Sequence, residues 1–484
     1  MQNLLTQLTT SFYSKLNFEP NLGQKELISK LTYFICTPQH NPIFVLKGYA
    51  GTGKTSIVGA LVKSLPAIQF NTVLLAPTGR ASKVLGNYAN KQAYTIHKKI
   101  YKTSNDEFTP TKFGLQNNTA INTLFIVDEA SMISDAQPGE NSYGNSLLED
   151  LLSYVFAGEN CKLLLVGDAA QLPPVGLSIS HALDLDYLRK RFSITVAEFE
   201  LTEVMRQNKD SFILNNATFL RDLMMLQIDV DGGVGRLFNK AEVKIEATND
   251  VVKVDGMDLQ DVLANSYRKY GSDETIIITR SNKRANAYNQ QIRALILDRD
   301  METPVTATDL MMVVKNNYNW LPKEASTNFI ANGDVIEIKR VRKIVEMHGF
   351  NFATVTVKML DFPNDPEFEC NILLDTILAD SPALPSEKNQ QLYASVVEDY
   401  AHIENAAVRF KQIKADPFLN ALQVKFAYAI TCHKAQGGQW QSVFVEQAYL
   451  SEDTVNKDYL RWLYTAFTRA TQKLNLIGFD EMIK

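Results

Sequence analysis

The chain is poor in cysteine and contains no hydrophobic run long enough to cross a membrane. Its four cysteines are scattered through 484 residues without a Cys-x-x-Cys pair, which argues against a zinc site or a disulfide framework. They are Cys36, Cys161, Cys370 and Cys432. No apolar stretch approaches the ~18 residues that a membrane-spanning helix needs, and Met1–Phe18 lacks the pattern of a signal peptide. These absences predict a cytoplasmic protein with no membrane partner.

The charge of the chain does not indicate a partner either. A net charge of −5 gives no support to nucleic-acid binding. Basic residues gather at 91–112, 189–191 and 339–343, but such clusters are more often solvated surface than phosphate tracks. The length is too great for one hydrophobic core, so we expect roughly three domains.

The most informative segment reads Gly-Tyr-Ala-Gly-Thr-Gly-Lys-Thr at 48–55 and matches the phosphate-loop pattern G-x-x-x-x-G-K-[ST]. An apolar strand at 43–46 precedes it and a helical sequence at 56–65 follows, which is the context that the motif requires. Backbone N–H groups of such a loop surround phosphate oxygens at the positive end of a helix. The alternative, a glycine-rich turn, is disfavoured by that context. The segment predicts binding of a nucleoside triphosphate.

Two residues of this loop have specific expected roles. Lys54 is expected to reach the β- and γ-phosphates, and Thr55 is expected to bind Mg²⁺. The predicted nucleotide-binding residues of the loop are Gly48, Ala50, Gly51, Thr52, Gly53, Lys54 and Thr55.

Apolar runs separated by helical stretches predict two parallel sheets. In the first half the runs are 43–46, 73–76, 124–127, 163–166 and 194–201. In the second half they are 275–279, 424–430, 443–446 and 474–477. Continuous apolar strands alternating with helices are typical of a parallel sheet covered on both faces. Ligands bind such sheets beyond the carboxyl ends of the strands.

The pattern changes between residues 332 and 374, where apolar and polar residues alternate with a period of two. This change predicts a small antiparallel barrel inserted into the second lobe, followed by one or two helices over 386–414. The predicted fold is therefore α/β, with two parallel-sheet lobes and an inserted barrel with a helical extension. The expected boundaries are 1–205 for the first lobe, 206–330 with 421–484 for the second, and 331–420 for the insertion.

Polar residues that suit ATP hydrolysis follow two of the strands. Asp128 and Glu129 end the apolar run 124–127, and a carboxylate pair there is costly unless it has a task. We expect Asp128 to hold Mg²⁺ and Glu129 to orient and deprotonate the attacking water; a solvated turn is the alternative. Gln171, in the proline-containing segment 167–176, can bond the γ-phosphate or its water, unless that segment is an ordinary connection.

Two arginines, Arg206 and Arg469, come from well-separated parts of the chain. Arginines that converge on a γ-phosphate stabilise the charge that develops during phosphoryl transfer. If one comes from each lobe, hydrolysis requires closure of the cleft between them. Spacing alone does not decide this, because most arginines are surface residues.

Taken together, these segments resemble superfamily 1 helicases of the RecD-like and phage Dda-like branch. The resemblance is collinear from Gln24 to Ala470. Besides the phosphate loop and 167–175, it is carried by 76–81 (Ala-Pro-Thr-Gly-Arg-Ala), 95–97 (Thr-Ile-His), 127–132 (Val-Asp-Glu-Ala-Ser-Met), 431–437 (Thr-Cys-His-Lys-Ala-Gln-Gly) and 464–470 (Tyr-Thr-Ala-Phe-Thr-Arg-Ala). It implies two RecA-like lobes, an SH3-like barrel, and ATP and Mg²⁺ as cofactors.

The resemblance also implies a function. The expected activity is that of an ATP-dependent DNA helicase, a monomeric motor that moves 5′-to-3′ on single-stranded DNA and unwinds forked duplex DNA. The alternative is a single-strand-stimulated ATPase or translocase subunit of a DNA repair or recombination complex, without unwinding of its own. A forked-duplex unwinding assay separates the two.

Further site residues follow from the same resemblance at matching positions. Gln24 is the expected adenine-reading glutamine, and Gly437 is expected near the γ-phosphate. The expected DNA contacts are Pro77, Thr78, His97, Asn282, Thr431 and His433. A strand-separating pin is expected within residues 100–119, with Phe108 and Phe113 as the candidate aromatics, although local packing of either ring is equally compatible with the sequence.

Overall fold

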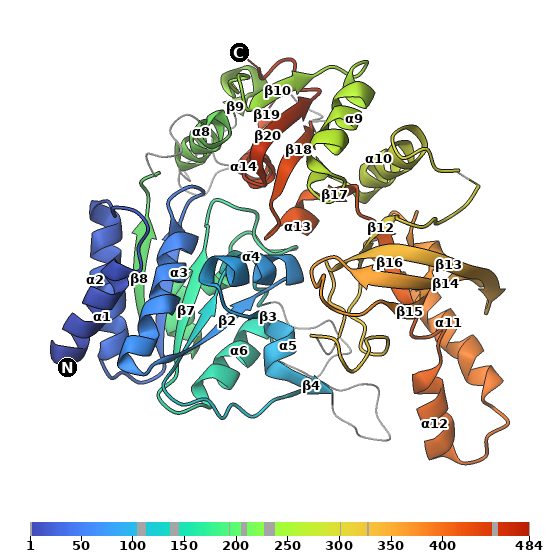
Figure 1. Ribbon diagram of the computed structural model, residues 1–484, viewed down its shortest axis with the longest axis horizontal. Coiled ribbons are helices and arrows are strands. Elements are labelled where there is room, and N and C mark those ends of the chain that lie inside the picture. The colour runs from blue at the N-terminus through green and yellow to red at the C-terminus, as the bar shows by residue number, and fades with distance from the viewer. Residues whose placement is uncertain are drawn as a thin grey trace.

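The computed structural model describes residues 2–103, 113–135, 145–192, 194–204, 211–226, 238–300, 302–326, 329–447 and 454–483. These residues form two parallel-sheet lobes and a closed barrel, and the barrel lies beside both lobes in Figure 1. The α/β fold with an inserted barrel is therefore confirmed.

The first lobe is built on a six-stranded parallel sheet in the order β3-β2-β6-β7-β1-β8. Its strands are β1 (Pro42–Gly48), β2 (Asn71–Ala76), β3 (Ala93–Thr95), β6 (Thr123–Val127), β7 (Lys162–Gly167) and β8 (Thr195–Leu201). Every residue of β6 and β7 is buried. Their sequences are almost uninterrupted apolar runs because both faces of these strands are covered.

Helices cover the two faces of this sheet, and alternate residues of each strand point to opposite sides. Phe44 and Leu46 of β1 belong to the core shared with α1 (Gln2–Ser14), α2 (Leu22–Cys36), α3 (Lys54–Ser64) and α4 (Gly79–Ala89). Ile43 and Val45 belong to the core shared with α5 (Ile96–Ile100), α6 (Leu147–Phe156) and α7 (Leu185–Phe192). The sheet is thereby held between two apolar layers.

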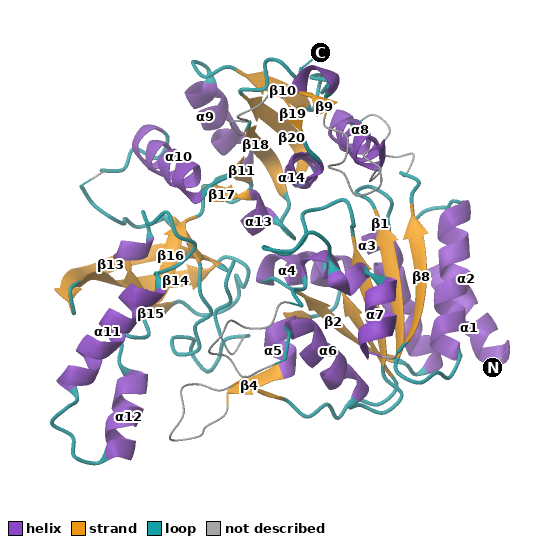
Figure 2. Ribbon diagram, turned by 180° about the vertical axis from the view of Figure 1, so that it is seen from behind, coloured by secondary structure: helices purple, strands orange, loops and turns teal. Residues whose placement is uncertain are grey.

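The second lobe has a five-stranded parallel sheet in the order β10-β20-β18-β11-β17. Its strands are β10 (Val251–Val254), β11 (Thr275–Thr279), β17 (Ala429–Thr431), β18 (Trp440–Glu446) and β20 (Ala470–Ile477). The helices around it are α8 (Phe212–Leu226), α9 (Leu259–Tyr270), α10 (Asn282–Leu295), α13 (Cys432–Ala435) and α14 (Lys457–Phe467). Figure 2 shows this lobe from behind, with α13 and α14 on the side of the first lobe.

The single strand predicted over 424–430 is wrong, because that run divides between two sheets. Its first part is β16 (Leu422–Phe426) of the barrel, and its last part is β17 of the second lobe. Asn289 of α10 holds the break by accepting the N–H groups of Tyr428 (3.1 Å) and Ala429 (2.8 Å). The run is apolar on both sides of the break, so its sequence carries no sign of the change of sheet.

The closed barrel consists of β12 (Leu310–Val313), β13 (Val335–Met347), β14 (Phe350–Met359), β15 (Phe368–Leu373) and β16. Its first and last strands lie outside the boundaries 331–420 that were expected for the barrel and its helical extension. Two helices, α11 (Ser386–Asp399) and α12 (Ala406–Ala415), extend from the barrel in Figure 1. Leu392 and Val396 of α11 are buried against Phe350 and Phe352 of the barrel.

The region expected to hold the pin contains the antiparallel strands β4 (Tyr101–Thr103) and β5 (Phe113–Leu115). Phe108 lies outside the described residues, and of Phe113 only the backbone is described. A second short pair joins β9 (Phe238–Asn239) to β19 (Thr454–Val455). No helix in the described part of the chain is long and apolar enough to cross a membrane.

Asp334 of the barrel packs against the first lobe at the start of α4. Its carboxylate accepts the N–H of Ala331 (2.7 Å) and leaves no room for a side chain at Gly79, where a Cβ would lie 2.1 Å from Oδ1. The residue is only 3% exposed. Burial, with the nearby charge of Asp361, raises the pKa of Asp334 to about 7. The barrel interface therefore holds a carboxyl group that favours its protonated form.

We predict that Asp334 makes the protein less stable as the pH rises from about 4 to about 7. The folded state holds this proton more tightly than the unfolded state, so the unfolding free energy falls by up to about 1.4 kcal/mol per pH unit across that window. Asp334→Asn should remove this contribution to the slope, measured by urea denaturation between pH 5 and 8. Asp261→Asn on the exposed side of α9 is the control; equal slopes in both variants would contradict the prediction.

Candidate nucleotide and nucleic-acid sites

A cleft of about 510 Å³ lies between the two lobes, at the carboxyl ends of β1, β6 and β7. Many of the residues predicted to bind or hydrolyse ATP line it. They are Ala50, Gly51, Gly53, Lys54, Thr55, Asp128, Glu129, Gln171, Gly437 and Arg469. The parallel sheet brings these residues together because the carboxyl ends of its strands share one edge.

The phosphate loop is held by its own polar groups. Lys54 Nζ donates to the carbonyl oxygens of Gly48 (2.6 Å) and Tyr49 (2.8 Å), and Thr52 Oγ1 also donates to Tyr49 O (2.8 Å). Gly53 precedes α3 with φ +86°, a backbone conformation that favours glycine. Gly48 and Thr52 therefore take part in hydrogen bonds within the loop. A bound phosphate would attract the Lys54 ammonium away from the two carbonyl oxygens.

Gln24 is fully buried and does not line the cleft. Its Nε2 donates to Thr52 O (3.1 Å), and its Oε1 accepts the N–H of Asn21 (3.2 Å) in a capping box at the start of α2. In this arrangement Gln24 braces the phosphate loop. An adenine contact would require its side chain to leave this packing.

Asp128 and Glu129 face the phosphate loop from the end of β6. Glu129 has φ +53°, an uncommon backbone conformation for a residue other than glycine, and its N–H donates to Asp128 Oδ1 (2.9 Å). Burial and the neighbouring charge of Glu129 raise the pKa of Asp128, while Lys54 acts in the opposite direction. Two carboxylates held side by side favour a cation between them and the phosphates.

These residues fit Mg²⁺. The Thr55 hydroxyl and the Asp128 carboxylate are oxygen donors, which this ion prefers. No cluster of three or more His, Cys, Asp or Glu ligands occurs among the residues that the structure describes. A Mg²⁺ ion that serves a nucleotide uses one or two protein ligands together with phosphate oxygens and water, so no such cluster is needed.

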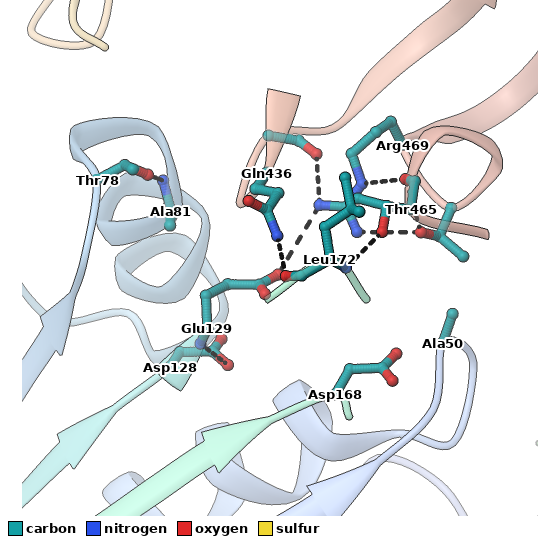
Figure 3. Close-up of polar contacts among 12 residues, drawn as sticks. Ala50, Thr78, Ala81, Asp128, Glu129, Asp168, Leu172, Gln436, Thr465 and Arg469 are labelled. Carbon is teal, nitrogen blue, oxygen red and sulfur yellow. Dashed lines mark hydrogen bonds and ion pairs between the residues drawn. The ribbon is translucent and has the colours of Figure 1, made fainter. Parts of the chain in front are cut away.

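Arg469 reaches this site from the second lobe. Its Nη1 lies 3.9 Å from Glu129 Oε1, and the buried guanidinium also donates to Thr465 O (3.0 Å) and Gly438 O (3.2 Å). Figure 3 shows Arg469 and Glu129 approaching each other from the two lobes. The other predicted arginine, Arg206, lies outside the described residues.

Three more hydrogen bonds cross between the lobes near Asp168. Tyr464 of α14 accepts the N–H of Ala50 (2.9 Å) and donates to Asp168 Oδ2 (2.6 Å). Burial and the charge of Asp168 raise the pKa of Tyr464 well above its usual value, so its hydroxyl remains protonated. Leu172 adds a contact when its N–H donates to Thr465 Oγ1 (2.9 Å), as Figure 3 shows. The sequence placed Tyr464 in a motif but assigned it no role.

Gln436 and Leu172 are also joined across the lobes. The Gln436 side chain donates from Nε2 to Leu172 O (2.7 Å) and is buried. The segment that contains Gln171 is therefore attached to the second lobe through its neighbour. Figure 3 places this contact beside Arg469.

A groove of about 1240 Å³ runs between the lobes and the barrel. All six residues expected to contact DNA line it: Pro77, Thr78, His97, Asn282, Thr431 and His433. Burial lowers the pKa of His97 and of His433, so both imidazoles are neutral near pH 7 and can bond phosphate or sugar. The barrel contributes Lys315 and Asn332, which the sequence did not single out.

The cleft and the groove meet at the start of α4. Gly437 lines the cleft and has φ +72°; a Cβ on it would lie 3.1 Å from the Oγ1 of Thr78, which lines the groove. Next to this contact Arg80 donates to Gln439 O (2.8 Å) and stacks on Trp440, with its guanidinium carbon 4.1 Å from the ring centre. A relative movement of the lobes would therefore change both sites.

Comparison with known proteins gives matches over both lobes. Residues 21–222 match the model of an AAA domain, and residues 426–477 match that of a UvrD-like helicase C-terminal domain. The ATP-dependent RecD2 DNA helicase of Deinococcus radiodurans is 31% identical over 206 residues, which are 40% of this chain and 25% of that protein. Together these matches support a superfamily 1 helicase of the RecD-like kind.

Two other proteins resemble this chain. The ATP-dependent DNA helicase Dda of phage T4 is 29% identical over 204 residues, covering 41% of this chain and 42% of Dda. The aligned segments thus cover less than half the length of both RecD2 and Dda. Among solved structures, the Pif1 helicase from Bacteroides, in complex with ADP-AlF3 and single-stranded DNA, aligns with 97% of this chain and 95% of its own at 14% identity and a TM-score of 0.46.

We predict that Tyr464→Phe destabilises the protein. The change keeps the ring and removes the hydroxyl that joins Asp168 to the phosphate loop. A hydrogen bond to a charged group contributes about 1.5–3 kcal/mol, and a loss of that size is expected in the unfolding free energy measured by urea denaturation. Tyr33→Phe, on an exposed tyrosine of α2, is the matched control. Equal stability of the two variants would show that the bridge contributes nothing.

Proposed function

We propose that the protein is an ATP-dependent DNA helicase that moves 5′-to-3′ along single-stranded DNA and unwinds the duplex ahead of it. The observation that carries this proposal is the contact between Gly437 and Thr78, since one borders the cleft and the other the groove. Closure of the cleft on ATP would change the grip of the groove on a strand. The names of RecD2 and Dda, both ATP-dependent DNA helicases, support the helicase activity but carry no information on direction.

In the proposed hydrolysis step, the residues of the cleft have separate roles. Lys54 would leave the loop carbonyls and contact the β- and γ-phosphates, and Glu129 would take a proton from the attacking water. Thr55 and Asp128 would hold Mg²⁺, which when bound neutralises charge on the phosphates. Arg469 would stabilise the charge that develops on the γ-phosphate, so that turnover requires both lobes.

In the proposed translocation step, the two lobes alternate in their grip on the strand. Pro77, Thr78 and His97 would hold it from the first lobe, and Thr431 and His433 from the second. Contacts to phosphate and sugar position a strand without reading its sequence, so the motor would act on any sequence. Asn282 stands at the start of α10 on the second-lobe side, where its amide donates to Asp380 O (3.0 Å).

Unwinding would follow if an aromatic of the β4–β5 region stacks on the last base pair, with Phe108 and Phe113 as candidates. We further propose a monomeric cytoplasmic motor that acts in DNA repair or recombination. The second candidate function is a single-strand-stimulated translocase subunit without unwinding of its own. The cleft and the groove support it equally well, because it differs only in the action of the pin.

Glu129→Gln is predicted to lower the ATPase kcat by about 10²-fold or more while ATP binding is retained, because the amide keeps the shape of the side chain but cannot take a proton. Steady-state hydrolysis with single-stranded DNA and binding of a fluorescent ATP analogue provide the two measurements. Glu26→Gln on the exposed side of α2 is the control. Turnover at the wild-type rate in Glu129→Gln would remove Glu129 from this role.

Partial duplexes with a 5′ or a 3′ single-stranded tail test the function itself. We predict ATP-dependent strand separation only with the 5′ tail. Separation only with the 3′ tail would contradict the proposed polarity. If single strands stimulate hydrolysis but neither duplex opens, the translocase function replaces the helicase function.

A further inference from the structure

A second cavity, of about 430 Å³, lies behind the ATP cleft and is separated from it by Asp168 and Gln171, which line both. We call it the rear cavity. Other residues that line it include Lys47, Ser131, Ile179 and Arg461. Since one ordered water needs only about 10–15 Å³, the rear cavity has room for a hydrated anion.

Two buried oxygen atoms of the rear cavity lack a protein partner. Ser131 is 1% exposed and Gln171 is 7% exposed. Neither Ser131 Oγ nor Gln171 Oε1 has a hydrogen-bond partner in the described parts of the chain. Buried polar groups are normally paired, so these two are available to a polar ligand.

Arg461 provides the cationic group. Its Nη1 donates to Ser178 O (2.7 Å), while its buried Nε has no partner and the side chain forms no ion pair among the described residues. The other two cations are already paired: Lys47 with Glu198 at 3.3 Å and Arg189 with Asp186 at 3.8 Å. Arg461 therefore carries a charge that no carboxylate in this cavity balances.

The acidic residues of the cavity wall are also engaged. Asp168 is bonded to the Tyr464 hydroxyl, and Asp184 Oδ1 accepts the N–H of Tyr187 (3.0 Å). Glu198 and Asp186 are the partners of Lys47 and Arg189. The donors without a partner at this site are thus the Ser131 hydroxyl and Arg461 Nε, a pair suited to an oxyanion.

Hydrolysis in the cleft would release orthophosphate next to Gln171, while ADP still occupies the phosphate loop. We propose that the rear cavity binds this orthophosphate and is the route by which it leaves. Gln171 separates the two spaces, and Ser131 and Arg461 receive the anion. The inference rests on the proposed function only in requiring that ATP be cleaved in the cleft; it does not require unwinding.

The first test narrows the outer part of the rear cavity with Ile179→Trp, since Ile179 is 46% exposed. Orthophosphate release is followed with a fluorescent phosphate-binding protein, and ATP cleavage is followed by rapid quench in the same full-length protein. Release should become severalfold slower while the cleavage rate is unchanged. The control is Met257→Trp, at a 95% exposed position of the second lobe, where neither rate should change.

The second test changes the anion-binding group. With inorganic phosphate as the probe, Arg461→Ala should weaken product inhibition by phosphate in the presence of ADP, and Arg461→Lys should restore part of it. A merely structural role of Arg461 would instead change cleavage and release together. Thermal unfolding shows whether each variant is folded. If either Ile179→Trp or Arg461→Ala fails to fold, the result of the other variant tests the proposal.

The outcomes separate this inference from the proposed function. If the wild-type protein does not cleave ATP, the proposed function fails before the cavity is tested. If it cleaves ATP but the ratio of release to cleavage is unchanged in Ile179→Trp, and phosphate inhibition is unchanged in Arg461→Ala, the rear cavity is not the exit.

Discussion

The structure depends on one set of hydrogen bonds across the lobe boundary, centred on the Tyr464 hydroxyl. This hydroxyl accepts the N–H of Ala50 in the phosphate loop and donates to the carboxylate of Asp168, which follows the neighbouring strand β7. Because Tyr464 and Asp168 are both buried, water does not compete for the bond between them, and this bond is stronger than it would be on a surface. The same helix, α14, is followed directly by Arg469, which is thereby held near Glu129. Together with the bonds of Leu172 to Thr465 and Gln436, this bridge fixes the position of the second lobe against the end of the first-lobe sheet.

The shape of the groove also depends on the contacts between the two lobes. The first turn of α4 lies against Gly437 of the second lobe and against Asp334 of the barrel, so three units meet at one helix end. Small residues are required there, because a Cβ on Gly79 or Gly437 would collide with the facing unit. A packed contact of this kind does not deform gradually; it either holds or separates, which suits a motor that alternates between two arrangements. The rear cavity lies at the same boundary, since Arg461 comes from α14 and Ser131 from the first lobe.

Much of this could be predicted from the sequence where a pattern is local. The strand and helix on either side of the phosphate loop, and the carboxylates that follow β6, lie where the apolar runs indicated. Prediction failed where one apolar run contributes to two sheets. The run 424–430 looks like one strand, yet its two ends belong to the barrel and to the second lobe, and Asn289 bonds the backbone between them. It also missed Lys315, which lies before the alternating pattern begins and reaches the groove only because the barrel closes.

The sequence by itself determined where the candidate site lies: a phosphate-loop motif, a carboxylate pair after a buried strand, and two parallel sheets whose strand ends hold them. These features depend on residues that are neighbours in the chain, so their spacing is sufficient. Only the tertiary structure decided which groups meet across the lobes. The bonds of Tyr464 and the bond of Gln24 to Thr52 join residues that lie far apart in the chain, and the unpaired donors of the rear cavity come from distant segments. Such contacts arise from packing and burial, which no local pattern of residues records.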